Sequence, residues 1–126
     1  LALDARCATD ITGFGLLGHA LHIALASGVT LRLHAGRVPL LPGARDAWES
    51  GMRTGGAERN LDHLQSRVDW GSSSPVERAL LIDPQTSGGL LVAVPAQRVA
   101  EYLSRVPGAV EVGDVVPRGD FELAVA

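Results

Sequence analysis

The sequence predicts an α/β domain of the layered α+β type, in which helices flank a mixed sheet of about four strands. Segments with helical periodicity stand between short apolar runs of strand character, and these runs lie far apart in the chain. The chain has 126 residues, which suits a single domain. A domain of this size buries roughly two-thirds of its unfolded surface, so a real core is expected.

The first predicted helix has the clearest sequence signal of all the elements. Residues 1–12 are a short lead-in, and residues 13–27 are apolar nearly all round, which predicts a buried helix. Thr12 is the expected N-cap of this helix, and Gly28 is the expected residue just beyond its end.

The segment after this helix alternates between apolar and polar residues. Residues 29–34 therefore predict a strand with Val29, Leu31 and Leu33 on one face. Glycines and prolines in residues 35–43 predict a loop, and residues 44–50 could form a short helix.

The middle of the chain has a weaker pattern. Residues 51–60 are glycine-rich and polar, and residues 61–74 are only weakly patterned. Residues 75–82 predict a helix. Its expected start consists of Ser74 as N-cap, Pro75 at the first position and Glu77 at the third.

The last third predicts two kinds of strand. A turn-rich loop at residues 83–89 leads into residues 90–94, a continuous apolar run that predicts a buried strand. Residues 96–106 predict an amphipathic helix, and residues 110–116 and 121–125 are expected to pair with each other across the turn at 117–120. The expected inner stripe of the helix consists of Val99, Tyr102, Leu103 and Val106.

Composition excludes several kinds of chemistry. All eleven basic residues are Arg, so the chain holds no P-loop, Schiff-base or general-base lysine. The Arg residues are spread out and the net charge is −3, so we expect no nucleic-acid binding. No apolar run reaches the roughly 20 residues that cross a membrane, so no membrane association is expected.

The single cysteine, Cys7, and the lack of a visible signal peptide predict a reducing, cytoplasmic setting. A start without Met predicts an excised fragment.

The first chemical motif is TDITGFGLLGH, residues 9–19. Its glycines fit GxGxxG, but no convincing strand precedes them and no acidic residue follows at the dinucleotide-binding distance. Asp10 has two interpretations: a helix-capping carboxylate, worth about 0.5–1 kcal/mol, or a ligand of Mg²⁺. The spacing alone favours capping. His19 and His22 share a helix face, and a core or interface role is favoured over a zinc site because no further ligand is near.

The second motif is DPQTSGG, residues 83–89. Consecutive backbone N–H groups around Gly88 and Gly89 could form an anion-binding nest, and Thr86 and Ser87 could donate to phosphate oxygens. The alternative is a plain helix-to-strand turn, in which Pro84 ends the helix. The segment is not a Walker loop, because the GK[ST] ending is missing.

Together these motifs resemble the C-terminal half of the selenophosphate synthetases (selenide, water dikinases), within the superfamily of aminoimidazole ribonucleotide synthetase. The resemblance covers almost the whole chain. It rests on Ala8–His19 (ATDITGFGLLGH), Pro39–Arg45 (PLLPGAR), Gly55–Asn60 (GGAERN), Asp83–Leu91 (DPQTSGGLL) and Val112–Val116 (VGDVV).

The resemblance implies a fold like the C-terminal domain of aminoimidazole ribonucleotide synthetase. It implies that residues 1–126 are the single C-terminal domain of a two-domain, homodimeric enzyme whose N-terminal ATP-binding and catalytic domain is absent here. Such enzymes convert ATP, selenide and water to selenophosphate, AMP and phosphate. No catalytic residue is then expected in this chain, and the fragment alone is expected to be inactive.

The resemblance also implies site residues. The metal-binding aspartate of the family's motif falls on Asp10, which favours Mg²⁺ ligation over capping. The candidates for nucleotide or phosphate contact are Thr9, Thr12, Gly13, Gly15, Asn60, Thr86, Ser87, Gly88 and Gly89. Ala57 stands where the family often has Thr, which weakens a hydroxyl role there.

Two other functions stay open at the level of sequence. The chain could come from another ATP-dependent member of the superfamily, such as AIR synthetase, thiamine-monophosphate kinase or the hydrogenase-maturation enzyme. It could also be a non-catalytic module that binds a partner or an anion. The sequence upstream of residue 1 would discriminate between them.

Overall fold

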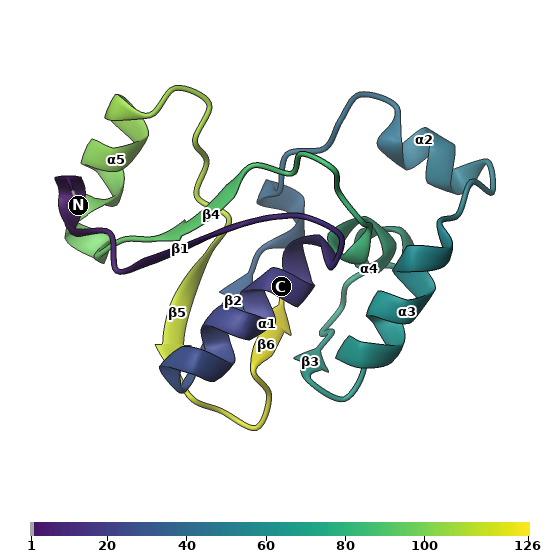
Figure 1. Cartoon of the computed structure of the whole chain (residues 1–126), viewed down its shortest axis with the longest axis horizontal. Helices are drawn as coiled ribbons and strands as arrows, with labels where there is room; N and C mark the ends of the chain where they lie inside the picture. Colours follow the sequence, from purple (N-terminus) through teal and green to yellow (C-terminus); the bar gives the residue numbers. More distant parts are fainter. Residues whose placement is uncertain (1) are drawn as a thin grey trace.

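The computed structural model describes residues 2–126, which form a four-stranded sheet, a two-stranded ribbon and five α-helices (Figure 1). The strands are β1 (Cys7–Asp10), β2 (Val29–Leu33), β3 (Val68–Asp69), β4 (Leu90–Ala93), β5 (Gly113–Pro117) and β6 (Leu123–Val125). The helices are α1 (Gly15–Ser27), α2 (Ala44–Glu49), α3 (Gly55–Leu64), α4 (Pro75–Ile82) and α5 (Val99–Arg105). The predicted layered class with a mixed four-stranded sheet is therefore confirmed.

The four-stranded sheet has the order β3-β6-β2-β5. β2 is antiparallel to β5 and parallel to β6, and β6 is parallel to β3. The expected pairing of the last two strands with each other is wrong, because β2 lies between them. Thr30 fixes the crossover: its Oγ1 donates to the Phe121 carbonyl at 2.6 Å and accepts from the Gly119 N–H at 2.9 Å.

α1 covers this sheet and supplies much of the core. Leu17 and Leu21 are almost completely buried, together with Leu64 from α3 and Leu123 from β6. The apolar character of residues 13–27 thus predicted the buried helix correctly. Gly28 ends it in the left-handed conformation, as expected.

The start of α1 differs from the prediction. The helix begins at Gly15, its N-cap position is Phe14, and no side chain caps it. Thr12 is not the N-cap, because its hydroxyl lies 3.0 Å from the His19 ring instead. A tight turn, closed by the Gly15 N–H donating to the Thr12 carbonyl, comes between Thr12 and the helix.

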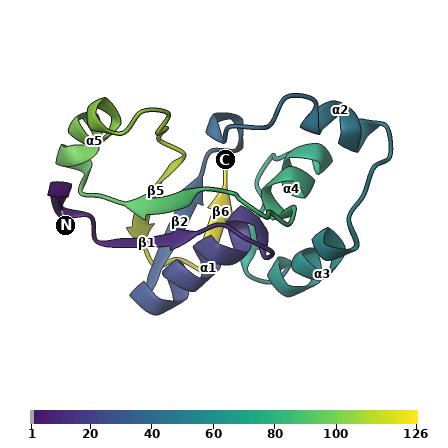
Figure 2. The same cartoon turned by 45° about the horizontal axis from the view of Figure 1, so that its top comes forward.

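β1 and β4 form a separate antiparallel ribbon, with Cys7 opposite Ala93 and Asp10 opposite Leu90. The lead-in thus contains a strand that its sequence pattern did not predict. Residues 90–94 were expected to be buried, and this is wrong: Leu90 is 71% exposed and the rest of β4 is half-buried. Figures 1 and 2 show α5 at one end of the ribbon and α2, α3 and α4 at the other.

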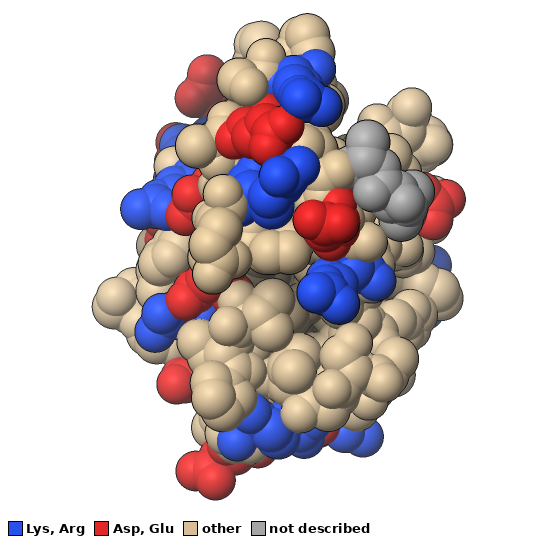
Figure 3. Space-filling model, turned by 90° about the vertical axis from the view of Figure 1, so that its left-hand side faces the viewer, with Lys and Arg blue, Asp and Glu red and all other residues tan. Residues whose placement is uncertain are grey.

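α5 lies at the edge of the molecule. Val99 and Tyr102 are half-buried, whereas Leu103 and Val106 of the expected inner stripe are exposed. Basic and acidic side chains are interspersed on this side of the molecule (Figure 3). Ion pairs on α5 join Glu101 to Arg98 at 3.1 Å and to Arg105 at 2.7 Å.

α3 and α4 differ in how well the sequence predicted them. α4 has the expected capping box, in which Ser74 and Glu77 hydrogen-bond reciprocally and Pro75 stands at the first position. α3 begins inside a segment that was expected only to be glycine-rich and polar. Its N-cap is Thr54, whose hydroxyl accepts the Ala57 N–H at 3.3 Å. Among residues 2–126, no helix has the length and apolar character needed to cross a membrane.

Candidate functional site

The two glycine-rich motifs lie against each other at one end of the ribbon. The Ile11 N–H donates to the Gly89 carbonyl at 3.0 Å, and the Gly88 N–H donates back to the Ile11 carbonyl at 3.1 Å. One turn further, the Gln85 N–H donates to the Thr12 carbonyl at 3.1 Å. The β1–β4 register therefore brings residues 9–15 and 83–89 together as one unit.

Two of the glycines are required by close backbone packing. Gly15 has a φ of +67°, and a Cβ built on it would lie 2.6 Å from the Ile82 carbonyl carbon. A Cβ on Gly88 would lie 2.7 Å from the Ile11 carbonyl oxygen. In both cases the backbone that the glycine approaches belongs to another segment of this chain.

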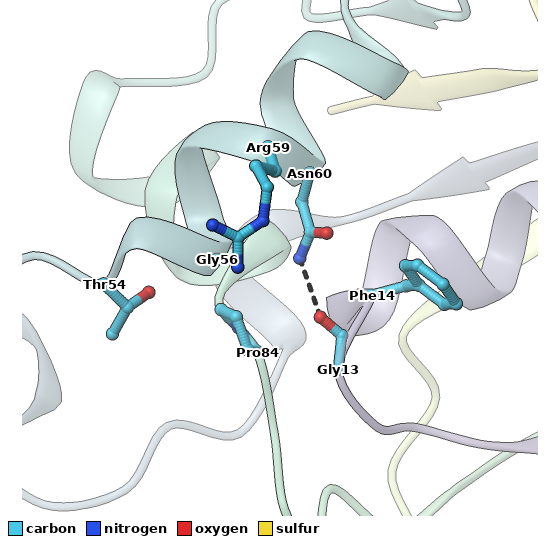
Figure 4. Close-up of a pocket in the computed structure, with 7 residues that line it drawn as sticks. All are labelled: Gly13, Phe14, Thr54, Gly56, Arg59, Asn60 and Pro84. Carbon is cyan, nitrogen blue, oxygen red and sulfur yellow. Dashed lines mark hydrogen bonds between the residues drawn. The ribbon is translucent and has the colours of Figure 1, made fainter.

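Asn60 of α3 adds a third segment to this unit. Its side chain is buried, with 8% of the residue exposed. Nδ2 donates to the Gly13 carbonyl at 3.0 Å (Figure 4). It also donates to the Ile82 carbonyl at 2.9 Å. One amide group therefore ties the start of α1 to the end of α4.

These segments enclose an open pocket of about 490 Å³ (Figure 4). Its lining consists of Gly13, Phe14, Thr54, Gly56, Arg59, Asn60 and Pro84. Of the residues expected at the site, it contains Gly13 and Asn60. The sequence reasoning did not name Phe14, Thr54, Arg59 or Pro84 as site residues, although three of them lie inside the quoted motifs and Thr54 directly precedes one.

His19 holds the loop before α1 in place. It is 8% exposed, and the Thr12 backbone N–H donates to its Nε2 at 3.1 Å. Since a backbone N–H can only donate, Nε2 is the acceptor in this hydrogen bond. His19 is thus a core histidine, as expected, whereas His22 is exposed and lies 6.0 Å from it between ring centroids.

Asp10 lies at the end of β1 with an exposed side chain. The capping interpretation is wrong, since α1 begins five residues later and has no side-chain cap. No group within residues 2–126 hydrogen-bonds or ion-pairs with the Asp10 carboxylate; only the Asp10 carbonyl accepts a bond, from Thr9 Oγ1 at 3.0 Å. The described residues contain no group of three or more metal-ligating side chains.

The remaining expected residues lie on the 83–89 loop of this unit. Thr86, Ser87 and Gly89 are exposed. The N–H of Gly88 is already used by Ile11, so it is not free for a phosphate. A side-chain hydrogen bond ties the first residue of this loop to the start of α3: Thr54 Oγ1 donates to Asp83 Oδ1 at 3.1 Å.

Three carboxyl groups with lowered pKa lie outside the pocket. Hydrogen bonds from Ser74 lower the pKa of Glu77, and a hydrogen bond from Arg32 lowers the pKa of Asp114. Burial would raise the pKa of Glu122, but hydrogen bonds, led by one from Arg67, outweigh it and lower this pKa. Glu77 belongs to the capping box of α4, and Asp114 and Glu122 accept hydrogen bonds from arginines at the four-stranded sheet.

The whole chain, residues 1–126, matches the family described as AIR synthase related protein, C-terminal domain. It is 43% identical over 121 residues to a selenide, water dikinase of Trichlorobacter lovleyi, covering 93% of this chain and 35% of that protein. The selenide, water dikinase of Geobacter metallireducens is 38% identical over 130 residues, covering 100% and 38%. That of Clostridium botulinum strain Eklund 17B is 37% identical over 130 residues, covering 99% and 38%.

A solved structure shares the fold. The thiamine monophosphate kinase of Aquifex aeolicus superimposes with a TM-score of 0.51 at 22% identity, covering 97% of this chain and 32% of that one. The chain thus spans little more than a third of the length of the relatives it matches.

Proposed function

Because this chain belongs to the family of AIR synthase related proteins, C-terminal domain, we propose that it is the C-terminal domain of a selenide, water dikinase. Such an enzyme makes selenophosphate, AMP and phosphate from ATP, selenide and water. The observation that carries the proposal is the identity of about 40% to selenide, water dikinases along nearly the whole chain. The chain covers 35–38% of these relatives, which supports a second domain that holds ATP and the catalytic groups. The absence of lysine agrees, since any lysine of the site has to come from elsewhere.

In this proposal Asp10 supplies one carboxylate ligand to Mg²⁺. Its support is an exposed carboxylate that no other described residue engages, at the end of a strand and directly before the glycine loop. When bound, Mg²⁺ neutralises phosphate charge and orients the phosphates. The hydroxyls of Thr9, Thr12, Thr86 and Ser87 and the N–H of Gly89 then lie beside the triphosphate.

The rest of the unit provides rigidity. Asn60, His19 and the backbone bonds between the two motifs fix residues 11–13, which directly follow Asp10. Phosphoryl transfer depends mainly on positioning and charge neutralisation, so a fixed loop is what this half of the enzyme has to contribute.

The test uses the longer protein that the encoding gene specifies. With ATP and selenide, ³¹P NMR is expected to show AMP, phosphate and selenophosphate, whereas the 126-residue chain alone releases none. Asp10→Asn in the longer protein is expected to lower turnover at least about 100-fold, since a metal-bound carboxylate is lost. Asp120→Asn, on the exposed turn before β6, is the matched control and retains turnover. AMP release by the chain alone, or full turnover by Asp10→Asn, contradicts the proposal.

A further inference from the structure

The ribbon of β1 and β4 has two different faces. Cys7 and Ala93 lie opposite each other in the register and line a cavity together with residues of α1 and β2, so this pair faces the body of the molecule. Side chains alternate along a strand, so the next residue of each strand points the other way. The outer face of the ribbon therefore consists of two cross-strand pairs, Ala8 with Val92 and Asp10 with Leu90.

This outer face is mainly apolar and open. Ala8 is exposed and Leu90 is 71% exposed, and among the large apolar side chains of residues 2–126 only Leu41 is more exposed. The ribbon contains two strands only, so each of them also has one edge without a neighbour. A two-stranded ribbon is marginally stable by itself, and apolar side chains gathered on one open face indicate a contact surface.

The length of the relatives favours a cover from the same polypeptide. The chain spans 35–38% of the selenide, water dikinases that it matches, and its family is described as a C-terminal domain. In the proposed enzyme most of the polypeptide therefore precedes this chain and is joined to it close to β1, which begins at Cys7. A tethered domain has a high effective concentration at the ribbon, so a modest apolar contact is enough to hold it there.

Asp10 defines the chemistry of the covering surface. It lies beside Leu90 on the outer face, and no described residue forms a hydrogen bond or an ion pair with its carboxylate. Burial of a charge without a partner is costly, so a surface that covers Leu90 has to bring a cation or hydrogen-bond donors to Asp10. The face thus fits a partner with an apolar area bordered by such groups.

We propose that the outer face of the ribbon is the surface on which the preceding domain of the longer protein docks. Apolar side chains of that domain cover Leu90 and Val92, and a cation or donor groups at the border of the contact meet Asp10. Docking orders a ribbon that has little support within the chain alone. The inference rests on the proposed function for the existence of the preceding domain.

The experiment compares exchange of backbone amides with D₂O in the longer protein and in the 126-residue chain, by mass spectrometry and without ATP, selenide or Mg²⁺. Amides of residues 7–10 and 90–93 are expected to exchange at least about tenfold more slowly in the longer protein, because the contact suppresses local opening of the ribbon. Leu90→Ser in the longer protein is expected to remove most of this protection. Leu41→Ser changes a similarly exposed leucine before α2 and, as the matched control, leaves exchange of the ribbon unchanged.

Three outcomes overturn the proposal. They are equal exchange of the ribbon in the two proteins, an equal effect of the two leucine changes, and protection of the ribbon in the 126-residue chain as its concentration rises, which means that a second copy covers the face. The thermal unfolding midpoint of Leu90→Ser in the 126-residue chain is expected to be unchanged, because the side chain is exposed there; this shows that lost protection is not a folding defect. Since the comparison involves no turnover, failure of the docking surface leaves the AMP-release assay unaffected, and the reverse also holds.

Discussion

Gly15 and Gly13 stand two residues apart at the start of α1, yet only Gly15 is fixed by its backbone. We expect Gly15→Ala to lower the free energy of unfolding by at least about 2–3 kcal/mol, from the positive φ and the clash with Ile82 together. Gly13→Ala is the matched control, since nothing lies within 4 Å of its built Cβ, and it is expected to change stability by less than about 1 kcal/mol. Urea unfolding measures both, and equal losses contradict this account.

Asn60 is the second residue on which the site depends. Asn60→Ala leaves the carbonyls of Gly13 and Ile82 without their donor in a buried setting, so we expect a loss of about 3 kcal/mol in unfolding free energy. Asp62→Ala, exposed on the same helix, should change it by no more than about 0.5 kcal/mol. Chemical denaturation checks both variants. A loss below about 1 kcal/mol for Asn60→Ala means that water replaces the amide and the clamp is unimportant.

At this scale the sequence predicted residue types better than their contacts. Glycine at position 15 indicated close approach, but not that Ile82 would be the neighbour. The spacing of Asp10 favoured a helix cap, and this cap does not exist, because α1 begins five residues later without a side-chain cap. Arg59 and Phe14 were missed because neither has a local signal. The pocket joins residues distant in sequence, and the packing of α3 against α1 and α4 places them together.

Helices with strong caps were predictable from local sequence. α4 carries its start signal in Ser74, Pro75 and Glu77, whereas α3 starts with two glycines, whose low helix propensity hid it. Tertiary burial of Asn60 and Leu64 stabilises α3 instead. The last two strands were located, but not their pairing, because the placement of β2 between them depends on contacts far apart in the chain.

One buried carboxylate makes the sheet sensitive to acid. Glu122, just before β6, accepts from Arg67 at 2.8 Å and from Arg118 at 2.6 Å. Burial would raise its pKa, but these hydrogen bonds lower it. A carboxyl group with a lowered folded-state pKa stabilises the fold above its unfolded value of about 4.3, and this stabilisation is lost as pH falls through the folded value.

We therefore expect Glu122→Gln to be less stable than the native chain at pH 7, with a difference that shrinks as the pH falls below about 4. Urea unfolding between pH 7 and pH 3 measures it. Glu111→Gln serves as control, because its pair with Arg37 is exposed and is expected to contribute little. A difference that stays constant with pH means that Glu122 stabilises the sheet by packing alone.

The molecule as a whole combines a well-packed layer with a thinly supported ribbon. β2 and β6 lie under α1, whereas β1 and β4 pair only with each other and leave Leu90 exposed. Two-stranded ribbons are marginal by themselves. We expect backbone amides of the ribbon to exchange with D₂O at least about 100-fold faster than those of Leu31 and Leu33. Equal protection, measured by NMR, contradicts this division.

The fold class was predictable at this scale because it depends on the order and kind of elements. The exposure of β4 was not predictable from the sequence. A continuous apolar run indicates a buried strand but does not identify the element that covers it.

The position of β6 bears on how this protein is made in the cell. The strand that comes last in the chain lies inside the sheet, with β2 on one side and β3 on the other. The sheet can close only after residues 123–125 have left the ribosomal exit tunnel. Until then α1 has no sheet against which to pack its apolar side, so the emerging chain exposes this surface and is prone to aggregate.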